Sequence, residues 1–494
     1  MSRTVFSQKS LGLLVVLGVM SPLAQASTDW AKLISPTGQS PFNFGVEIQG
    51  PEPYFKDADV EFAPASLTKY FTSFTALQKL GPDYRFVTTV EWKKVQPGVV
   101  TGLKVIGSGD PSWGLSELGE TIKTRVALIA ERLYQAGIRE VDGEVSAISE
   151  DLRWDNMQYP EGSDPADHLE CYGALPQAFN LDLNCAGFQV NNPDVGFWQS
   201  EGVPVPVILD ITPGAHTRLS VMGRTVNGIP NAKYIIQGTW AAGASPVSFN
   251  LPIHDVKTWV QNLLTSALRD RGIKVLTEKT PAIVGDTARD QILSPKLSDI
   301  LKPFLKKSLN VIGEGLFRFL GQKFGPKDLA LLPAGQAVIA DFIADIGTGT
   351  SENFSSQMTI LDGSGLSRSD QITPHSLLVL LSEQSKADYF SAIWNALPIA
   401  GVDGTLADRM KNTPAAGVIR AKTGTLTGVY NLAGYAPVFG DHGLISDYVP
   451  FVMLTKLSDR LDSGAGVHAA EDRVAAALAT LVSAKPPESS VLRP

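Results

Sequence analysis

The chain has 494 residues, of which 44% are hydrophobic and 19% charged, and its formal net charge is −8. We expect more than one domain, because a single hydrophobic core stops growing at about 250–300 residues. The acidic balance, without a basic cluster, argues against nucleic acid or an anionic membrane surface as the main partner.

The first 26 residues have the pattern of a secretory signal peptide. Arg3 and Lys9 precede an apolar run over residues 11–20, and residues 24–26 place small side chains at the cleavage positions. We therefore expect Ser27 to begin the mature protein and the protein to reach the periplasm. No other apolar run has the roughly 18–20 residues of a spanning helix, so we predict no transmembrane segment.

A helix is predicted at the motif Ser66-x-x-Lys69. Pro64 suits a first turn, and apolar residues recur at helical spacing from Leu67 to a stop at Gly81. Residues three apart share one helix face, so Lys69 can reach the Ser66 hydroxyl. The free backbone N–H groups at the start of the helix, near Ser66, can stabilise negative charge there.

The segment after a predicted strand at 87–92 contains two modules with one pattern. An apolar stripe over 118–133 ends at a Gly-Ile pair, and so does a stripe over 256–268, each followed by a strand-like stretch. We therefore expect α+β modules between the two ends of the chain.

The cysteines and histidines are few. Cys171 and Cys185 are 14 positions apart and form no CxxC motif. In an exported chain a disulfide between them is expected, and two buried thiols are the alternative. The six histidines lack metal-ligand spacing, so we predict no metal and no cofactor. No GxSxG elbow offers a serine for a Ser-His-Asp mechanism.

A helix is predicted over 308–321, opened by Ser308-x-Asn310. Ser308 can relay a proton to a leaving nitrogen, and Asn310 can orient a lysine and a substrate amide. Gly313 and Gly315 would loosen this helix by about 1 kcal/mol each relative to alanine.

The last third is predicted to form strands over 418–425, 429–438 and 448–454, with a closing helix over 467–482. The first strand carries a Lys-Thr-Gly-Thr motif at 422–425.

The edge of that strand can pair with an extended peptide, while Lys422, Thr423 and Thr425 hold a C-terminal carboxylate. Gly424 permits a close backbone approach. The N–H groups of Ser66 and Thr425 would form an oxyanion hole.

Lys422 would also affect Lys69 of the Ser66-x-x-Lys69 motif. Lys69 can act as a base only when it is neutral, and burial together with a nearby Lys422 would lower its pKa. Alone, each motif is compatible with a capped helix or a polar surface. Together, in this order and behind an export signal, they are specific.

The chain resembles the DacB-type family of low-molecular-mass penicillin-binding proteins (penicillin-binding protein 4), D-alanyl-D-alanine carboxypeptidase/endopeptidases. Besides the three motifs, the resemblance is carried by the stretches 362–368 with 373–374, 397–406, 422–434, 109–111 and 171–174. It covers nearly all of the mature chain.

The resemblance implies that Ser66 is the acylated nucleophile and Lys69 its base, with Ser308, Asn310 and Lys422 as the other catalytic residues. It implies an α+β, penicillin-recognising transpeptidase-like fold, an antiparallel sheet packed by helices. The gap of 242 positions between the two serines fits smaller α+β domains inserted there, which class A β-lactamases lack.

We accordingly expect a serine peptidase domain formed by residues 27–92 and 290–494, with a disordered tail from 485. Residues 93–289 would form the inserted domain or domains. The family also reads the third-position diamino acid of the stem peptide with a polar residue of the inserted region. Asp167 is our candidate, and a solvated loop carboxylate is the alternative.

The implied activity is removal of the terminal D-Ala from peptidoglycan stem peptides and cleavage of D-Ala–diaminopimelate cross-links. β-Lactam antibiotics would be covalent inhibitors. A β-lactamase is the enzymatic alternative, and a non-catalytic peptidoglycan- or β-lactam-binding module is the alternative from another class. Nothing in the sequence predicts the oligomeric state.

Overall fold

The computed structural model describes residues 27–35, 42–193, 196–276, 285–347, 356, 358–457 and 464–483. The predicted signal peptide at 1–26 and the predicted tail from 485 lie outside these residues. Among the described residues, no helix is long and apolar enough to cross a membrane.

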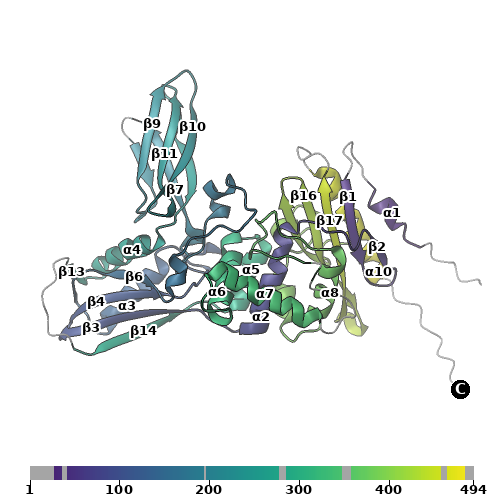
Figure 1. Cartoon of the computed structure of the whole chain (residues 1–494), viewed down its shortest axis with the longest axis horizontal. Coiled ribbons are helices and arrows are strands. Elements are labelled where there is room, and N and C mark those ends of the chain that lie inside the picture. The colour runs from purple at the N-terminus through teal and green to yellow at the C-terminus, as the bar shows by residue number, and fades with distance from the viewer. Residues whose placement is uncertain are drawn as a thin grey trace, which may run out of the picture.

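A five-stranded antiparallel sheet in the order β15-β16-β17-β1-β2 forms the centre of one end of the molecule (Figure 1). Its strands are β1 (Phe42–Ile48), β2 (Tyr54–Lys56), β15 (Arg420–Leu426), β16 (Val429–Phe439) and β17 (Ile445–Leu457). The middle of β16 is buried on both faces because helices cover both sides of the sheet. The three strands predicted in the last third correspond to β15, β16 and β17.

Helices pack against the two faces of this sheet. α10 (Ala465–Ser483) and α1 (Trp30–Leu33) share one hydrophobic cluster with it, and α2 (Thr68–Leu80) and α8 (Pro374–Gln384) share the other. The other described helices outside the inserted region are α5 (Leu297–Lys306), α6 (Asn310–Phe324), α7 (Leu331–Gly347) and α9 (Phe390–Ala396).

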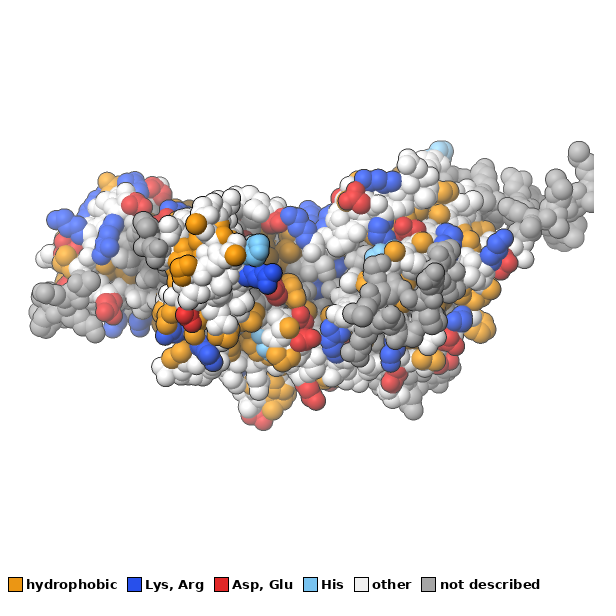
Figure 2. Space-filling view, turned by 90° about the horizontal axis from the view of Figure 1, so that it is seen from above, with side chains coloured by type: hydrophobic (Ala, Val, Ile, Leu, Met, Phe, Trp, Pro, Cys, Tyr) orange, Lys and Arg blue, Asp and Glu red, His pale blue; other side chains and the backbone are white. Residues whose placement is uncertain are grey.

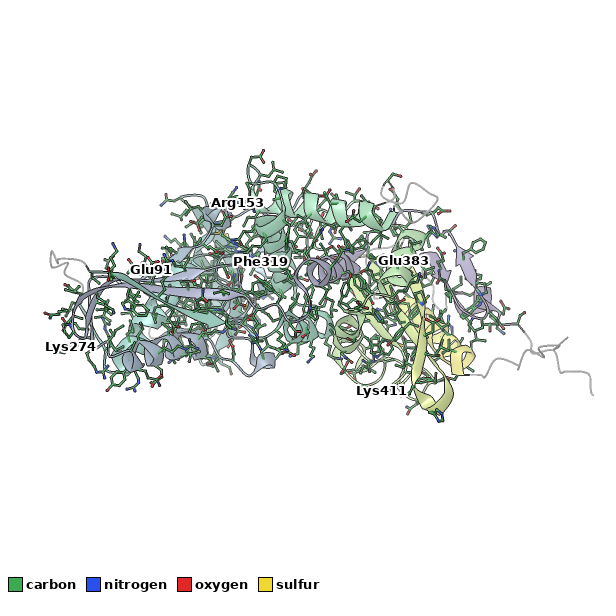
Figure 3. All side chains as sticks on the ribbon, turned by 90° about the horizontal axis from the view of Figure 1, so that it is seen from below. Glu91, Arg153, Lys274, Phe319, Glu383 and Lys411 are labelled. Atoms are coloured by element: carbon green, nitrogen blue, oxygen red, sulfur yellow. A yellow bond between two sulfur atoms is a disulfide. The ribbon has the colours of Figure 1, made fainter. Side chains whose placement is uncertain are left out.

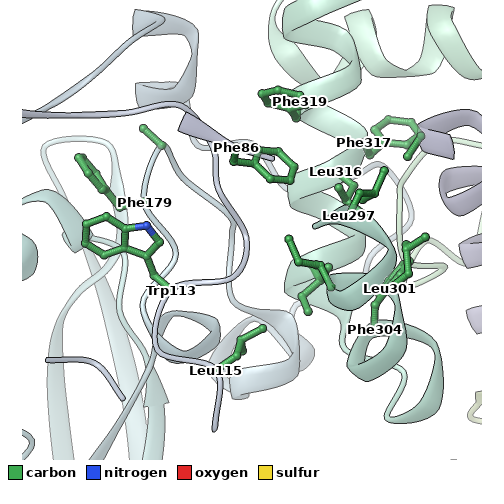
Figure 4. Packing of buried hydrophobic residues seen from close by; sticks show 14 of the residues in the cluster. Phe86, Trp113, Leu115, Phe179, Leu297, Leu301, Phe304, Leu316, Phe317 and Phe319 are labelled. Carbon is green, nitrogen blue, oxygen red and sulfur yellow. The ribbon is translucent and has the colours of Figure 1, made fainter. Parts of the chain in front are cut away.

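The hydrophobic core continues from these helices into the inserted region. Figure 4 shows Phe86, just before β3, beside Phe319 of α6, and the two ring centroids are 4.7 Å apart. Arg153 of the inserted region (Figure 3) also donates to the carbonyl oxygens of Pro326 and Leu329, between α6 and α7.

The inserted region contains a six-stranded sheet in the order β13-β5-β4-β3-β14, with β6 paired to β4. Its strands are β3 (Val87–Gln96), β4 (Val99–Gly107), β5 (Glu140–Asp142), β6 (Ser146–Ser149), β13 (Lys274–Leu276) and β14 (Thr287–Leu293). The two predicted helix-then-strand modules are α3 (Thr124–Gln135) with β5, and α4 (Val256–Asp270) with β13. They lie side by side, since β5 and β13 pair in parallel.

The expected domain boundaries fall inside two neighbouring strands of this sheet. Position 92/93 cuts β3 and position 289/290 cuts β14, yet these strands pair along their length. Glu91 of β3 (Figure 3) and Arg289 of β14 lie opposite each other and form an ion pair with an N–O distance of 2.8 Å. An inserted region over 87–293 keeps the sheet intact.

Two three-stranded sheets form a lobe that projects from the inserted region (Figure 1). One, in the order β12-β7-β8, consists of β7 (Cys185–Asn192), β8 (Gly196–Gln199) and β12 (Val247–Pro252). The other, in the order β10-β11-β9, consists of β9 (Val207–Pro213), β10 (Arg218–Val226) and β11 (Ile229–Trp240). Figure 2 shows charged side chains of both signs interspersed over one face of the whole molecule.

Candidate active site

Ser66 and Lys69 lie together at the start of α2. The predicted helix begins at Thr68, and Ser66 lies in the 3-10 turn Ala65–Leu67 that precedes it. The turn starts at Ala65, whose φ of 49° is a strained left-handed conformation that breaks the helix there. The expected contact is nevertheless present, because Lys69 Nζ donates to Ser66 Oγ at 2.8 Å.

Lys69 is fully buried and has three hydrogen-bond acceptors. Besides Ser66 Oγ, its Nζ donates to Asn310 Oδ1 at 2.8 Å and to the Ser364 carbonyl oxygen at 2.6 Å. Burial lowers the pKa of Lys69 to about 7, although the nearby carboxylates Asp362 and Glu314 act in the opposite direction. A neutral amine is therefore available next to the serine near neutral pH.

Lys422 and Ser308 form a second lysine–serine pair. Lys422 Nζ donates to Ser308 Oγ at 2.9 Å and to the Thr423 carbonyl oxygen at 2.8 Å. Burial lowers the pKa of Lys422, and repulsion from Lys69 lowers it further. Burial, one of the two causes expected from the sequence, is thus the main cause of the lowered pKa of both lysines, and repulsion between the lysines adds to it only at Lys422.

Ser308 and Asn310 lie at the junction of α5 and α6. Ser308 occupies the turn before α6, with a left-handed φ of 59°, and Asn310 is the first residue of the helix rather than its third. A Cβ at Gly313 would lie 2.5 Å from the Gly363 carbonyl oxygen. This glycine therefore permits close packing of α6 against the 362–368 loop, so its effect differs from the loosening expected from helix propensity.

The loop over residues 362–368 positions the carbonyl that receives Lys69. The buried Asp362 carboxylate accepts the backbone N–H groups of Ser364, Gly365 and Ser367. Burial raises the pKa of Asp362 to about 6. This stretch carried the family resemblance, but the sequence did not identify the Ser364 carbonyl as a partner of Lys69.

β15 forms one edge of the five-stranded sheet and carries the Lys-Thr-Gly-Thr motif. A Cβ at Gly424 would lie 2.6 Å from the Pro64 carbonyl oxygen, so only glycine lets this strand approach the serine turn. The Thr423 hydroxyl donates to Thr405 Oγ1 at 2.9 Å. The edge strand and the serine therefore border the same space.

That space is a cleft of about 410 Å³ between the sheet and the inserted region. Its lining residues are Ser66, Asp167, Tyr172, Ser308, Asn310, Gly365, Leu366, Arg368, Thr405, Thr423, Thr425, Leu426 and Thr427. Most of the predicted catalytic and substrate-binding residues line this cleft. Lys69, Lys422 and Gly424 are buried and do not line it. Tyr172, Arg368 and Thr405 were missed, although all three fall within stretches that carried the resemblance.

Tyr172 links the inserted region to the cleft. Its carbonyl oxygen accepts the Asn310 Nδ2 amide at 3.0 Å, which fixes the Asn310 oxygen toward Lys69. Its phenol donates to Asp167 Oδ1 at 2.7 Å. The adjacent residue, Cys171, forms the predicted disulfide with Cys185, which is confirmed with a Cα–Cα distance of 5.4 Å.

Replacing Cys171 and Cys185 together with alanine should lower the free energy of unfolding by about 3 kcal/mol, because the cross-link restricts the unfolded chain. Urea unfolding followed by circular dichroism measures this change. Wild-type protein kept in dithiothreitol is the control and should unfold at the same urea concentration as the variant. Equal midpoints for oxidised wild type and variant would contradict the prediction.

The chain is similar in sequence to known D-Ala-D-Ala carboxypeptidases. Residues 48–464 match the D-Ala-D-Ala carboxypeptidase 3 (S13) family. The D-alanyl-D-alanine carboxypeptidase of Actinomadura sp. (strain R39) is 28% identical over 468 residues, covering 89% of this chain and 81% of the relative. The D-alanyl-D-alanine carboxypeptidase DacB of Haemophilus influenzae is 27% identical over 389 residues, covering 75% and 76%.

Solved structures agree with the predicted fold. Penicillin binding protein 4 (dacB) from Haemophilus influenzae superposes with a TM-score of 0.72 at 22% identity, covering 92% of this chain and 99% of that one. A structure of the same protein complexed with a β-lactam gives a TM-score of 0.68 at 25% identity, covering 91% and 99%. The α+β fold, with an antiparallel sheet packed by helices, is therefore confirmed.

Proposed function

Because the chain belongs to the D-Ala-D-Ala carboxypeptidase 3 (S13) family, we propose that it cleaves D-alanyl peptide bonds of peptidoglycan through an acyl-enzyme on Ser66. The observation that carries this proposal is the contact of the Ser66 hydroxyl with a buried lysine whose pKa is about 7. Such a lysine is a base matched to neutral pH.

The steps follow the hydrogen bonds of the site. Neutral Lys69 takes the Ser66 proton as Oγ attacks the carbonyl carbon of the penultimate D-Ala. As the C–N bond breaks, Ser308, hydrogen-bonded to Lys422, passes its proton to the leaving nitrogen and regains one from the Lys69 ammonium, which becomes neutral again. Water then attacks the ester carbonyl and gives a proton to Lys69, which returns it to Ser66 Oγ as the ester bond breaks and the shortened stem peptide leaves.

Three further sets of groups would hold the substrate. The N–H groups of Ser66 and Thr425 would stabilise the oxyanion, since both residues line the cleft on opposing elements. An extended stem peptide would add to the edge of β15. Thr423 and Thr425, with the charge of Lys422 behind them, would hold the terminal carboxylate.

The same chemistry serves two leaving groups, a terminal D-Ala and a D-Ala–diaminopimelate cross-link. We propose both activities, because the cleft is open and a bulkier amine leaves by the same steps. Purified pentapeptide monomers and cross-linked dimers, offered together and resolved by liquid chromatography, test this. We expect D-Ala to be released from the pentapeptide monomers and the cross-linked dimers to be cut into monomers. Dimers that stay intact after all pentapeptides have lost their terminal D-Ala would contradict the endopeptidase activity.

We propose that Asp167 and Arg368, which both line the cleft, recognise the ammonium and carboxylate at the end of the diaminopimelate side chain. Asp167→Asn should lower kcat/KM for diaminopimelate stems by about 10- to 100-fold, because a charged hydrogen bond is lost. Stems with alanine at the third position should be unaffected. Glu170→Gln, a nearby exposed carboxylate outside the cleft, is the control. Equal losses on both stems would contradict a role in specificity.

The proposed setting is the periplasm. The signal-peptide pattern of residues 1–26 supports it, and so does the disulfide, which persists in an oxidising compartment. Stem peptides would be the substrates there, and β-lactams would be covalent inhibitors of the same serine.

A further inference from the structure

The sheet β12-β7-β8 has an outer face that the steps above do not use. In paired strands, residues opposite each other point to the same side. Phe188 and Val190 of β7 pack inward with Phe249 of β12. The residues between them therefore point outward.

The outward residues comprise a glycine, an aromatic residue and four polar residues, and none carries a charge: Gly187 and Gln189 on β7, Ser248 and Asn250 on β12, and Trp198 and Ser200 on and beside β8. Gln189 Nε2 donates to Ser248 Oγ at 3.1 Å. Trp198 is 56% exposed, which is unusual for so large an aromatic side chain.

Three of these side chains surround Gly187. A Cβ built there would lie 3.5 Å from the Trp198 ring, 3.6 Å from Ser200 Oγ and 3.7 Å from Asn250 Oδ1. The glycine is therefore the floor of a shallow site with an indole, a hydroxyl and an amide around it. We name these four residues, with Gln189 and Ser248, the outer sheet face.

The outer sheet face is continuous with the active site. A cavity of about 460 Å³ has Gly187, Ser200 and Asn250 on one wall and Ser308 and Asn310 on another. Both of the latter also line the catalytic cleft. A long ligand can therefore contact the outer sheet face and the cleft at the same time.

We propose that the outer sheet face binds the glycan strand of peptidoglycan, a chain of N-acetylated amino sugars, while a stem peptide of that strand enters the cleft. This inference rests on the proposed function. A sugar ring offers an apolar C–H face that stacks on an exposed indole. Its hydroxyl and acetamido groups exchange hydrogen bonds with amide and hydroxyl side chains. The uncharged face suits a neutral glycan better than a polyanion or a charged peptide.

The direct test is binding of peptide-free glycan strands, prepared from sacculi with an amidase, to the full mature protein by isothermal titration calorimetry. Trp198→Ala should weaken binding by about 3- to 10-fold, as expected for loss of one aromatic contact. Gly187→Val, which fills the floor without removing a hydrogen bond, should also weaken it. Phe55→Ala, an aromatic side chain that is 75% exposed on β2, is the matched control and should bind as wild type.

A second readout separates this inference from the proposed function. On intact sacculi Trp198→Ala should raise KM without changing kcat, whereas disaccharide-free peptide dimers should be cleaved as by wild type. Glycan binding without any hydrolysis would support the inference and contradict the proposed function. Hydrolysis by a protein that binds no glycan, or binding that both variants leave intact, would overturn the inference alone.

Discussion

Replacing Ser66 with alanine should abolish hydrolysis of D-alanyl stem peptides and covalent labelling by penicillin together. We expect kcat to fall by about 10⁴- to 10⁶-fold, as for other enzymes that lose a nucleophilic serine. Both reactions need the same oxygen, which lies 2.8 Å from the amine of the base. Muropeptide chromatography and fluorescent penicillin on a denaturing gel measure the two losses.

Ser73→Ala is the matched control for this variant. Ser73 lies on the same helix, and its buried hydroxyl has no hydrogen-bond partner among the described residues, so its removal should leave both reactions intact. Unchanged circular dichroism of Ser66→Ala would show that the fold is retained. Persistent labelling of a folded Ser66→Ala protein would assign the nucleophile to another residue.

Replacing Lys69 should remove the base without removing the nucleophile. Lys69→Met should slow acylation by about 10²- to 10⁴-fold, the usual contribution of general base catalysis. Lys69→Arg should be equally slow at every pH, because a guanidinium does not lose its proton. Stopped-flow acylation by a chromogenic β-lactam measures these rates.

The pH dependence of the wild type follows from the same residue. The pKa of Lys69 is about 7, so the amine is neutral above that pH and charged below it. The acylation rate should therefore be constant in the alkaline range and fall as the pH drops through about 7. A rate that stays constant between about pH 5 and pH 9 would exclude Lys69 as the base.

The residues that meet at the cleft were predictable because they occur in short motifs whose spacing matches local structure. Ser66 and Lys69 are one turn apart, and burial alternates along β15 from Lys422 to Thr425. One of their partners was not predictable in the same way. The Ser364 carbonyl that receives Lys69 is a backbone group 295 positions away, and no local pattern reports it.

Burial was expected to lower the pKa of Lys69, but the elements that bury this side chain were hidden from the sequence. Polar residues at a helix start are usually exposed, whereas here Lys69 is enclosed by α6 and the 362–368 loop. The close approach of Gly313 to Gly363 permits this packing. A helix-propensity scale gives only the destabilising effect of a glycine in a helix and not this packing role. Strand pairing at the edges of the inserted region was hidden for a similar reason, because β3 and β14 pair across almost 200 intervening positions.

The central claim is that Ser66 forms the acyl-enzyme, and peptide mapping of the penicillin-treated protein by mass spectrometry tests it most directly. The protein should gain the mass of one penicilloyl group, and the tryptic peptide that contains Ser66 should carry it. The adduct should persist long enough to be isolated, as expected for a peptidase that β-lactams inhibit. An adduct on another residue, or rapid turnover of penicillin without any adduct, would contradict the account.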